Sequence, residues 1–285
     1  MKASIRGTEI YFDIAGMQLR PTAHNDFIEK PVLFMLHGGP GGDHLRFKQH
    51  SLALQDSAQL VFIDHRGCGH SKKTHRQEYT LDNNIEDIEA LRQYLGLNKI
   101  IVLGTSYGGI VAQGYAIRYP KHLDKLILVC TAPSFRAFEE SQTILRKKGT
   151  PAQIKAAKTL FDGAFKTSKE AEKFFITMAT LYSETAKKKK PLPFGKIKTI
   201  WSHDALNQGF KYFLREFDFI PKLKKITCPT LILAGQEDWI CPPSQSKIIA
   251  EQIPQAELHI FKNCSHAIAT DAAKKYLKAI KQFLL

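Results

Sequence analysis

Short apolar runs rich in β-branched residues alternate along this chain with stretches of helical periodicity. The runs span residues 31–36, 60–63, 99–103, 125–129, 230–234 and 257–261. Strands that alternate with helices form a mostly parallel sheet with helices on both of its faces. The pattern therefore predicts an α/β fold built on one central parallel sheet.

Two of the helical stretches have well-marked apolar faces. Residues 82–95 place aliphatic side chains on one face and acidic residues in the first turns, which predicts a packing helix. Residues 270–285 place Leu277, Ile280 and Leu284 at helical spacing with lysines opposite. This second amphipathic pattern predicts a helix that docks on one face of the sheet.

The alternation stops between residues 134 and 218, where the sequence becomes helical and rich in lysine. This segment holds 17 Lys and Arg against 9 Asp and Glu, an excess of eight positive charges out of the chain's +14. We interpret it as a helical cap inserted into the fold. The predicted division is a first core part at 1–133, the cap at 134–218, and a second core part at 219–285.

A serine between glycines stands where one strand meets the next helix. In Gly104-Thr-Ser-Tyr-Gly108, Ser106 follows the apolar run 99–103 and precedes a helical pattern. A turn this sharp strains the serine backbone and leaves room for glycine alone two residues before and after it. It also points a helix N-terminus at the reacting oxygen. The arrangement predicts a nucleophile elbow with Ser106 as the catalytic nucleophile.

A serine nucleophile needs an imidazole base, and the imidazole needs a carboxylate that orients it. Asp238 follows the predicted strand 230–234, and His266 comes 28 residues later, after the strand that ends at Phe261. The chain order serine, acid, histidine is that of an α/β-hydrolase triad. We predict the catalytic triad Ser106, Asp238 and His266, and favour Asp238 over its neighbour Glu237 as the acid.

Acyl transfer also needs N–H donors for the oxyanion. Tyr107, the residue after the serine, supplies one donor. The other is expected from the loop His37-Gly-Gly-Pro-Gly-Gly42, with Gly39 preferred and Gly38 as the alternative. We interpret His37 as a structural residue of this loop, which lacks the phosphate-binding glycine patterns.

Composition narrows the remaining classes of function. The five cysteines are scattered without any Cys-x-x-Cys pair, which indicates neither a disulfide framework nor a zinc site and suits a reducing cytoplasm. The first residues lack the apolar stretch of a signal peptide, and no apolar run is long enough to span a bilayer. The basic residues have no aromatic interleaving or nucleic-acid-binding module. We expect a cytoplasmic protein that neither binds nucleic acid nor inserts into a membrane.

A second polar loop, 64–71, follows the strand 60–63. Its Asp64, His65 and His70 raise the question of a metal, but its glycines and Ser71 favour a tight, internally hydrogen-bonded loop beside the cleft. Cys68 in the same loop has no base at a recognised spacing. We therefore expect no metal and no cofactor.

With these motifs the chain resembles the α/β-hydrolase superfamily and, within it, the proline iminopeptidase (prolyl aminopeptidase) group of serine peptidases. The resemblance implies an α/β-hydrolase fold and a substrate whose free N-terminal amine is held by cap carboxylates. The cap acids that could hold the amine by their chemistry are Glu139, Glu140, Glu184 and Glu216. The motifs that carry the resemblance are His37-Gly-Gly-Pro-Gly-Gly42, Asp64-His-Arg-Gly-Cys-Gly-His-Ser71, Gly104-Thr-Ser-Tyr-Gly-Gly109, Gly235-Gln-Glu-Asp238 and His266.

The predicted function is that of a serine hydrolase that reacts through an acyl-enzyme. The first interpretation is an aminopeptidase that releases N-terminal proline or another small residue from short peptides. The alternative is a carboxylesterase, thioesterase or lactonase of the same fold, acting on a small molecule. A third, from another class, is a hydrolase-fold ligand receptor with little turnover. All three leave the oligomeric state open.

Overall fold

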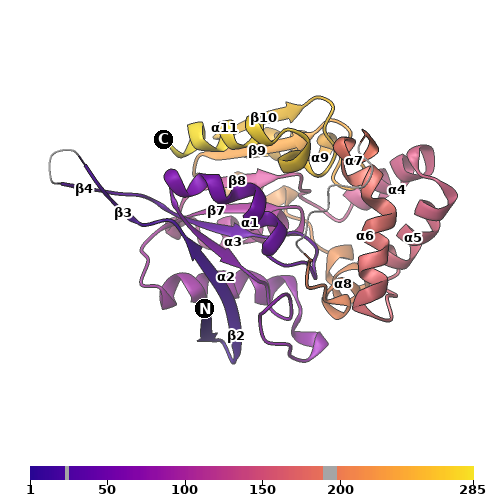
Figure 1. The fold of residues 1–285 in the computed structure, drawn as a ribbon, viewed down its shortest axis with the longest axis horizontal. Helices are drawn as coiled ribbons and strands as arrows, with labels where there is room; N and C mark the ends of the chain where they lie inside the picture. The colour runs from indigo at the N-terminus through magenta and orange to yellow at the C-terminus, as the bar shows by residue number, and fades with distance from the viewer. Residues whose placement is uncertain (23–25, 189–197) are drawn as a thin grey trace.

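A computed structural model describes residues 1–22, 26–188 and 198–285. Its centre is an eight-stranded sheet in the order β1-β2-β6-β5-β7-β8-β9-β10 (Figure 1). All neighbours from β6 to β10 in this order pair parallel, while β1 and β2 pair antiparallel with each other and β2 with β6. The strands are β1 Lys2–Ile5, β2 Thr8–Ala15, β5 Val32–Leu36, β6 Gln59–Ile63, β7 Ile100–Thr105, β8 Leu123–Val129, β9 Thr230–Gly235 and β10 Ala256–Phe261.

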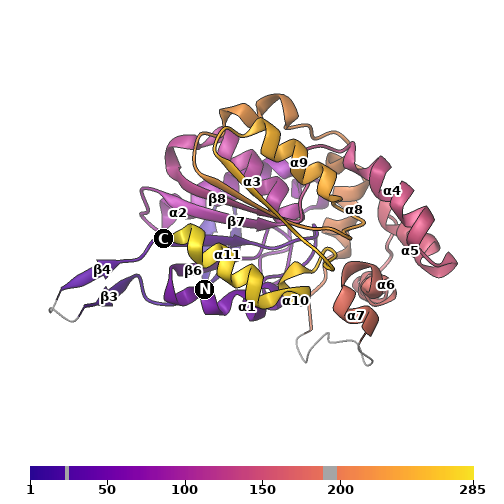
Figure 2. The ribbon, with the colours of Figure 1, turned by 90° about the horizontal axis from the view of Figure 1, so that it is seen from above.

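The six parallel strands lie where the sequence predicts them, within two residues at each end. The two N-terminal strands and a small hairpin of β3 (Leu19–Pro21) and β4 (Phe27–Glu29) are additions to that prediction. The hairpin projects away from the rest of the molecule (Figures 1 and 2). The predicted α/β fold with a mostly parallel sheet is confirmed.

Helices cover both faces of the sheet, as expected (Figure 2). One core layer joins Phe34 and Val102 to α2 (Leu81–Tyr94), α3 (Tyr107–Arg118) and α9 (Pro243–Gln252). The opposite layer joins the alternate strand residues, such as Met35 and Leu103, to α1 (Leu45–Ser51) and α11 (Ala273–Leu284). Successive strand side chains point to opposite faces, so the uninterrupted apolar runs supply both layers.

The predicted packing helix is α2, and it begins and ends within one residue of expectation. Thr80 caps it by accepting the N–H of Asn83 at 3.1 Å. The single helix predicted for residues 270–285 is divided in the structure. Two helices, α10 (Ile268–Asp271) and α11, meet at Ala272. None of the described helices is long and apolar enough to cross a bilayer.

The segment between β8 and β9 leaves the sheet and forms helices at one end of the molecule (Figure 1). They are α4 Ala137–Lys148, α5 Pro151–Phe161, α6 Ser168–Tyr182, α7 Glu184–Lys188 and α8 His203–Lys211. Its two ends meet in a single β-bridge between Ser134 and Asp218. We propose that residues 134–218 form an inserted cap and that 1–133 and 219–285 form the core, because the chain leaves and re-enters the core at this bridge.

Candidate active site

Ser106 stands in a strained turn between β7 and α3. Its backbone angles, φ 54° and ψ −120°, lie outside the usual regions for a residue with a side chain. A Cβ on Gly104 would lie 2.2 Å from the carbonyl oxygen of Gly108, and a Cβ on Gly108 would lie 2.2 Å from that of Leu36. Both contacts are far inside van der Waals distance, so this close approach of strand and helix requires glycine at both positions.

Hydrogen bonds from the neighbouring strand hold the strained turn. The Ser106 N–H donates to the carbonyl of Val129 at 2.9 Å, and the Thr131 hydroxyl donates to the carbonyl of Ser106 at 2.8 Å. The N–H groups of Gly109 and Ile110 donate to the same carbonyl. The backbone of Ser106 is therefore tied on both sides, and this compensates the strain.

Asp238 and His266 meet at the carboxyl ends of β9 and β10. Nδ1 of His266 donates to Oδ2 of Asp238 at 2.7 Å, while Oδ1 accepts the N–H groups of Ile240 and Cys241 at 3.0 Å each. The Asp238 side chain is fully buried, and His266 is 12% exposed. This bond leaves Nε2 as the ring nitrogen that can exchange a proton with a substrate or with Ser106.

The glycine loop after β5 lies against the serine. A Cβ on Gly38 would be 3.1 Å from the Cβ of Ser106, and Gly39 has a φ of +137°. The N–H of Tyr107 opens α3 and so has no acceptor within that helix. Gly39 and Tyr107, the predicted oxyanion donors, thus stand on two backbone segments that converge on Ser106.

The buried ring of His37 stabilises this loop through two hydrogen bonds. Its Nδ1 donates to the carbonyl of Gly38 at 2.7 Å, and its Nε2 accepts the N–H of His65 at 3.2 Å. Burial lowers the pKa of His37, so the ring is neutral at neutral pH. A neutral ring with both nitrogens engaged agrees with the structural role expected for His37.

Loop 64–71 is tied to the core by its own hydrogen bonds. Asp64 is fully buried and accepts the N–H groups of His44 and His70 and the Nδ1 of His44, each at 2.8 Å. Burial alone would raise the pKa of Asp64, but these donors and the nearby histidines lower it. Ser71 donates to the carbonyl of Asp64 at 2.6 Å. The tight loop expected from its glycines and serine is observed.

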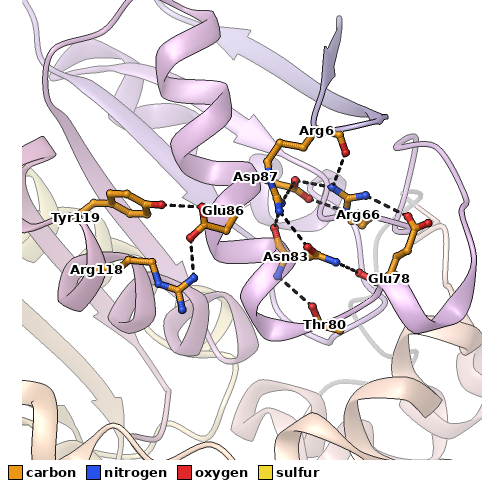
Figure 3. Close-up of polar contacts among 9 residues, drawn as sticks. All are labelled: Arg6, Arg66, Glu78, Thr80, Asn83, Glu86, Asp87, Arg118 and Tyr119. Carbon is orange, nitrogen blue, oxygen red and sulfur yellow. Dashed lines mark hydrogen bonds and ion pairs between the residues drawn. The ribbon is translucent and has the colours of Figure 1, made fainter.

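An arginine anchors the same loop to helix α2 (Figure 3). Arg66 donates through two nitrogens to the two carboxylate oxygens of Asp87, at 2.7 and 2.9 Å, and both side chains are buried. Arg6 donates to the same carboxylate at 2.8 Å. The preceding residue, His65, packs its ring against Tyr107 with a centroid distance of 5.5 Å. The anchored loop therefore supports one of the two candidate oxyanion donors.

A cavity of about 320 Å³ lies between the cap and the carboxyl ends of the strands. Ser106, His266 and the loop residues from His37 to Gly39 line its floor. The wall opposite is largely apolar and is built from cap side chains. The nucleophile and the base thus face one partly open cavity of a size that suits a small ligand.

The four cap acids proposed to bind an amine are placed elsewhere. Among the described residues, none of the four lines the cavity. Glu139 and Glu216 are exposed, Glu184 pairs with Lys187, and Glu140 accepts hydrogen bonds from Ser244 and Gln245 of α9. The last contact ties the cap to the core, which is a structural role.

Contacts between the cap and the histidine loop were not foreseen from the sequence. Asp271 accepts the Ser183 hydroxyl at 2.6 Å and the N–H groups of Glu184, Thr185 and Ser265 at 2.9–3.0 Å. Burial alone would raise the pKa of Asp271, but these four donors lower it. The acid therefore joins the start of α7 to the residue before His266. A lone Asp in an amphipathic helix carries no sequence signal for this role.

Cysteines beside the site lack the properties of nucleophiles. Burial raises the pKa of the Cys68 thiol to about 12 and that of Cys241, which lies beside Ser106, well above its usual value. Both thiols are therefore protonated at neutral pH. Among the described residues, one group has its polar atoms close enough together for a metal, within 4.8 Å: Cys130, Asp238 and His266. Burial keeps the Cys130 thiol protonated, and Asp238 and His266 already bond to each other, which favours a proton-transfer pair.

Comparison with known proteins gives a consistent result. The chain matches the family described as the alpha/beta hydrolase fold over residues 31–273. It is 32% identical over 287 residues to the proline iminopeptidase PfmaB of Pestalotiopsis fici, covering 98% of this chain and 97% of that protein. A proline iminopeptidase of Lactobacillus helveticus is 29% identical, with 99% and 96% covered. The structure of an alpha/beta fold family hydrolase from Bacillus anthracis superposes with a TM-score of 0.80 at 22% identity, covering 100% of this chain and 98% of that one.

Proposed function

Because this chain belongs to the alpha/beta hydrolase family, we propose that it is a serine hydrolase, and an aminopeptidase that releases N-terminal proline or another small residue from short peptides. One observation carries the proposal of mechanism. The strained serine of the elbow and a histidine bonded to a buried aspartate at 2.7 Å line the same cavity. This is the arrangement that acyl transfer requires.

In the proposed reaction Ser106 attacks the acyl carbon while Nε2 of His266 takes the proton of the serine hydroxyl. Asp238 holds the ring in the required tautomer and stabilises its cation. The N–H groups of Gly39 and Tyr107 stabilise the oxyanion of the tetrahedral intermediate. His266 then gives its proton to the departing amine, which leaves Ser106 acylated. Attack by water on the acyl-enzyme releases the acid by the same steps.

The aminopeptidase assignment is supported by the relatives and by the small volume of the cavity. Both reported relatives are named proline iminopeptidases and align with nearly the whole chain. A cavity of about 320 Å³ is near the lower limit for ligand sites, which suits a small acyl group rather than a long peptide.

A second candidate is a carboxylesterase, thioesterase or lactonase that uses the same triad. The observation in its favour is that, among the described residues, no glutamate lines the cavity. An ester or lactone with an uncharged acyl group would need no such residue.

The experiment that separates the candidates compares proline 4-nitroanilide with short-chain 4-nitrophenyl esters. A strong preference for the anilide supports the aminopeptidase. Turnover of esters without any turnover of the anilide would reject it in favour of the second candidate. If the folded protein cleaves neither class, the serine-hydrolase proposal fails and the ligand-receptor interpretation remains.

We also propose a cytoplasmic location and a small-molecule or short-peptide partner, without nucleic acid or membrane insertion. All five cysteines are free thiols, as a reducing compartment favours. The positive charges of the cap suit a solvated surface and need no polyanionic partner.

A further inference from the structure

The charges that face the cavity do not form a site for an ammonium group. Apart from histidines, the charged residues of the described lining are Asp43 and Arg46. The oxygens of Asp43 accept the N–H groups of Leu45 at 3.1 Å and Ile200 at 2.6 Å. Burial lowers the pKa of Arg46, and the nearby charge of Asp43 opposes that shift. The one carboxylate of this lining is thus engaged with the backbone and stands beside a positive charge.

Residues outside the described ranges cannot supply the missing carboxylate. Residues 23–25 read Ala-His-Asn, and residues 189–197 read Lys-Lys-Pro-Leu-Pro-Phe-Gly-Lys-Ile. Neither segment contains Asp or Glu, and the second adds positive charge. Glu172, the other acid that acts on Arg46, is exposed on α6. The described lining of the cavity therefore offers no free carboxylate for an amine, and the sequences of the two remaining segments add none.

Aromatic and aliphatic side chains of the cap form the wall. Phe138 and Phe210 lie with ring centroids 5.7 Å apart, and Phe217, Leu160 and Leu214 extend the same surface. Phe210, Phe217, Leu160 and Leu214 are buried. A substrate group enclosed by this wall exchanges water for carbon contacts.

An acyl group that carries an ammonium and one that is a plain hydrocarbon ring differ in how favourably they bind against this apolar wall. An ammonium taken from water into an apolar pocket loses solvation that an opposite charge or several acceptors must replace. A hydrocarbon ring of the same size gains free energy from the same transfer. The apolar wall therefore favours the hydrocarbon ring, and the described lining offers the ammonium group no free carboxylate.

We propose that the acyl pocket selects by size and apolar character and does not recognise an amine. Its substrates are amides and esters of small, uncharged, apolar carboxylic acids, with prolyl derivatives accepted through their ring. The inference rests on the proposed serine-hydrolase function and deepens it, because it names the chemical class of the acyl group.

The test uses two substrates that differ at one ring atom. Proline and cyclopentanecarboxylic acid are compared as 4-nitroanilides and as phenyl esters, and kcat/KM for each is divided by its rate of alkaline hydrolysis. We expect the cyclopentanecarbonyl substrate to match or exceed the prolyl one. A site built around the ring nitrogen would reject this analogue by about 10⁴-fold or more. A prolyl preference above about tenfold overturns the proposal.

A pair of variants adds the interaction that the pocket lacks. Phe138 lines the cavity and is half-buried, so Phe138→Glu and Phe138→Gln differ only in charge. We expect Phe138→Glu to favour the prolyl substrate by about tenfold relative to Phe138→Gln. Equal preferences in two folded variants, checked by thermal melting, count against the proposal. If either variant fails to fold, the comparison of substrates on the unaltered protein still decides.

The outcomes also separate this inference from the proposed function. If the folded protein cleaves no amide or ester, the serine-hydrolase function itself is wrong. If it cleaves the prolyl substrates and not their ring analogues, the hydrolase function stands and the inference fails.

Discussion

The carboxyl edge of the sheet and the cap face the same cavity but are built by different means. At the sheet edge, backbone geometry and buried hydrogen bonds hold each polar group: the strained Ser106, the glycine loop of His37 and the bond from His266 to Asp238. The cap contributes mainly apolar side chains, held by packing and by a few polar contacts with the core.

The difference indicates that the sheet edge positions the reacting atoms and that the cap selects the substrate. Reacting atoms must be held within a fraction of an ångström, and backbone constraints do this better than side-chain packing. Apolar walls discriminate weakly between similar groups, and one methylene changes the preference by about 10- to 200-fold. We therefore expect changes at the sheet edge to abolish activity and changes in the cap to alter substrate preference.

The strongest test of the comparison is the chemistry of the sheet edge. We expect Ser106→Ala to lower kcat by about 10⁶-fold and Asp238→Asn by about 10⁴-fold, because each removes a member of the proposed catalytic triad. Glu237→Gln is the matched control, since Glu237 is its half-buried neighbour and pairs with Lys148. Steady-state kinetics on one chromogenic substrate measures all three. A large loss in Glu237→Gln with none in Asp238→Asn would reassign the acid.

The second test concerns backbone space at the elbow. A Cβ at position 108 would stand 2.2 Å from the Leu36 oxygen, so we expect Gly108→Ala to destabilise the fold by about 3 kcal/mol or more. Gly96, which follows α2, is the control because it has a φ of +67° and open space around its Cβ position. Gly96→Ala should cost about 1–2 kcal/mol from strain alone. Urea unfolding compares the two, and equal losses would contradict the role of close approach.

The third test concerns the junction of the two regions. The four donors to Asp271 lower its pKa in the folded protein, so its contribution to stability is full above the unfolded value of about 3.9. That contribution disappears as the pH falls through the depressed folded pKa. At pH 7 we expect Asp271→Asn to cost about 1–2 kcal/mol.

Melting temperatures at several pH values measure this effect. The difference between the unaltered protein and Asp271→Asn should shrink below about pH 4. Asp56→Asn is the control, because Asp56 is 75% exposed and pairs weakly with Lys281. A difference between the unaltered protein and Asp271→Asn that is constant from pH 7 to pH 3 would show that charge is not the cause.

The smallest effects are expected at the exposed acids of the cap. Glu139→Gln and Glu216→Gln should change the KM for proline 4-nitroanilide by less than about twofold, because neither side chain faces the cavity. Phe138→Ala, which opens the apolar wall, should raise the same KM by about tenfold. A large increase in KM for either glutamine variant would reverse the assignment of specificity to the apolar wall.

Much of the core is predictable because its signals are local. The parallel strands appear as apolar runs, α2 has a clear apolar face, and Gly104 and Gly108 flank Ser106 where a strand meets a helix. In the antiparallel strand β2, buried and half-buried residues alternate along most of Thr8–Ala15. This pattern is a weaker sequence signal than an apolar run, and the pairing of β2 with β6 in the structure makes it clear. The hairpin of β3 and β4 consists of two exposed three-residue strands and has no pattern long enough to detect.

The candidate site divides in the same way. Ser106, Asp238 and His266 follow three separate strands in a recognisable order, and parallel strands bring their carboxyl ends to one edge. The four cap glutamates were predicted to bind an amine from their residue type alone, and residue type does not tell where a side chain points. Helix packing then decides that Glu140 reaches α9 and that Phe138, two residues earlier, lines the cavity.

The sequence by itself determined which strands the predicted triad residues follow. Glycine spacing, apolar runs and the chain order of serine, acid and histidine are all properties of short segments. It did not determine the cavity wall. Which cap residues face Ser106 depends on how the helices between residues 134 and 218 pack on the core, through contacts between residues far apart in the chain. Only the tertiary structure therefore revealed that aromatic rings of the cap line the pocket of the elbow serine, and that the described lining of this pocket holds no free carboxylate.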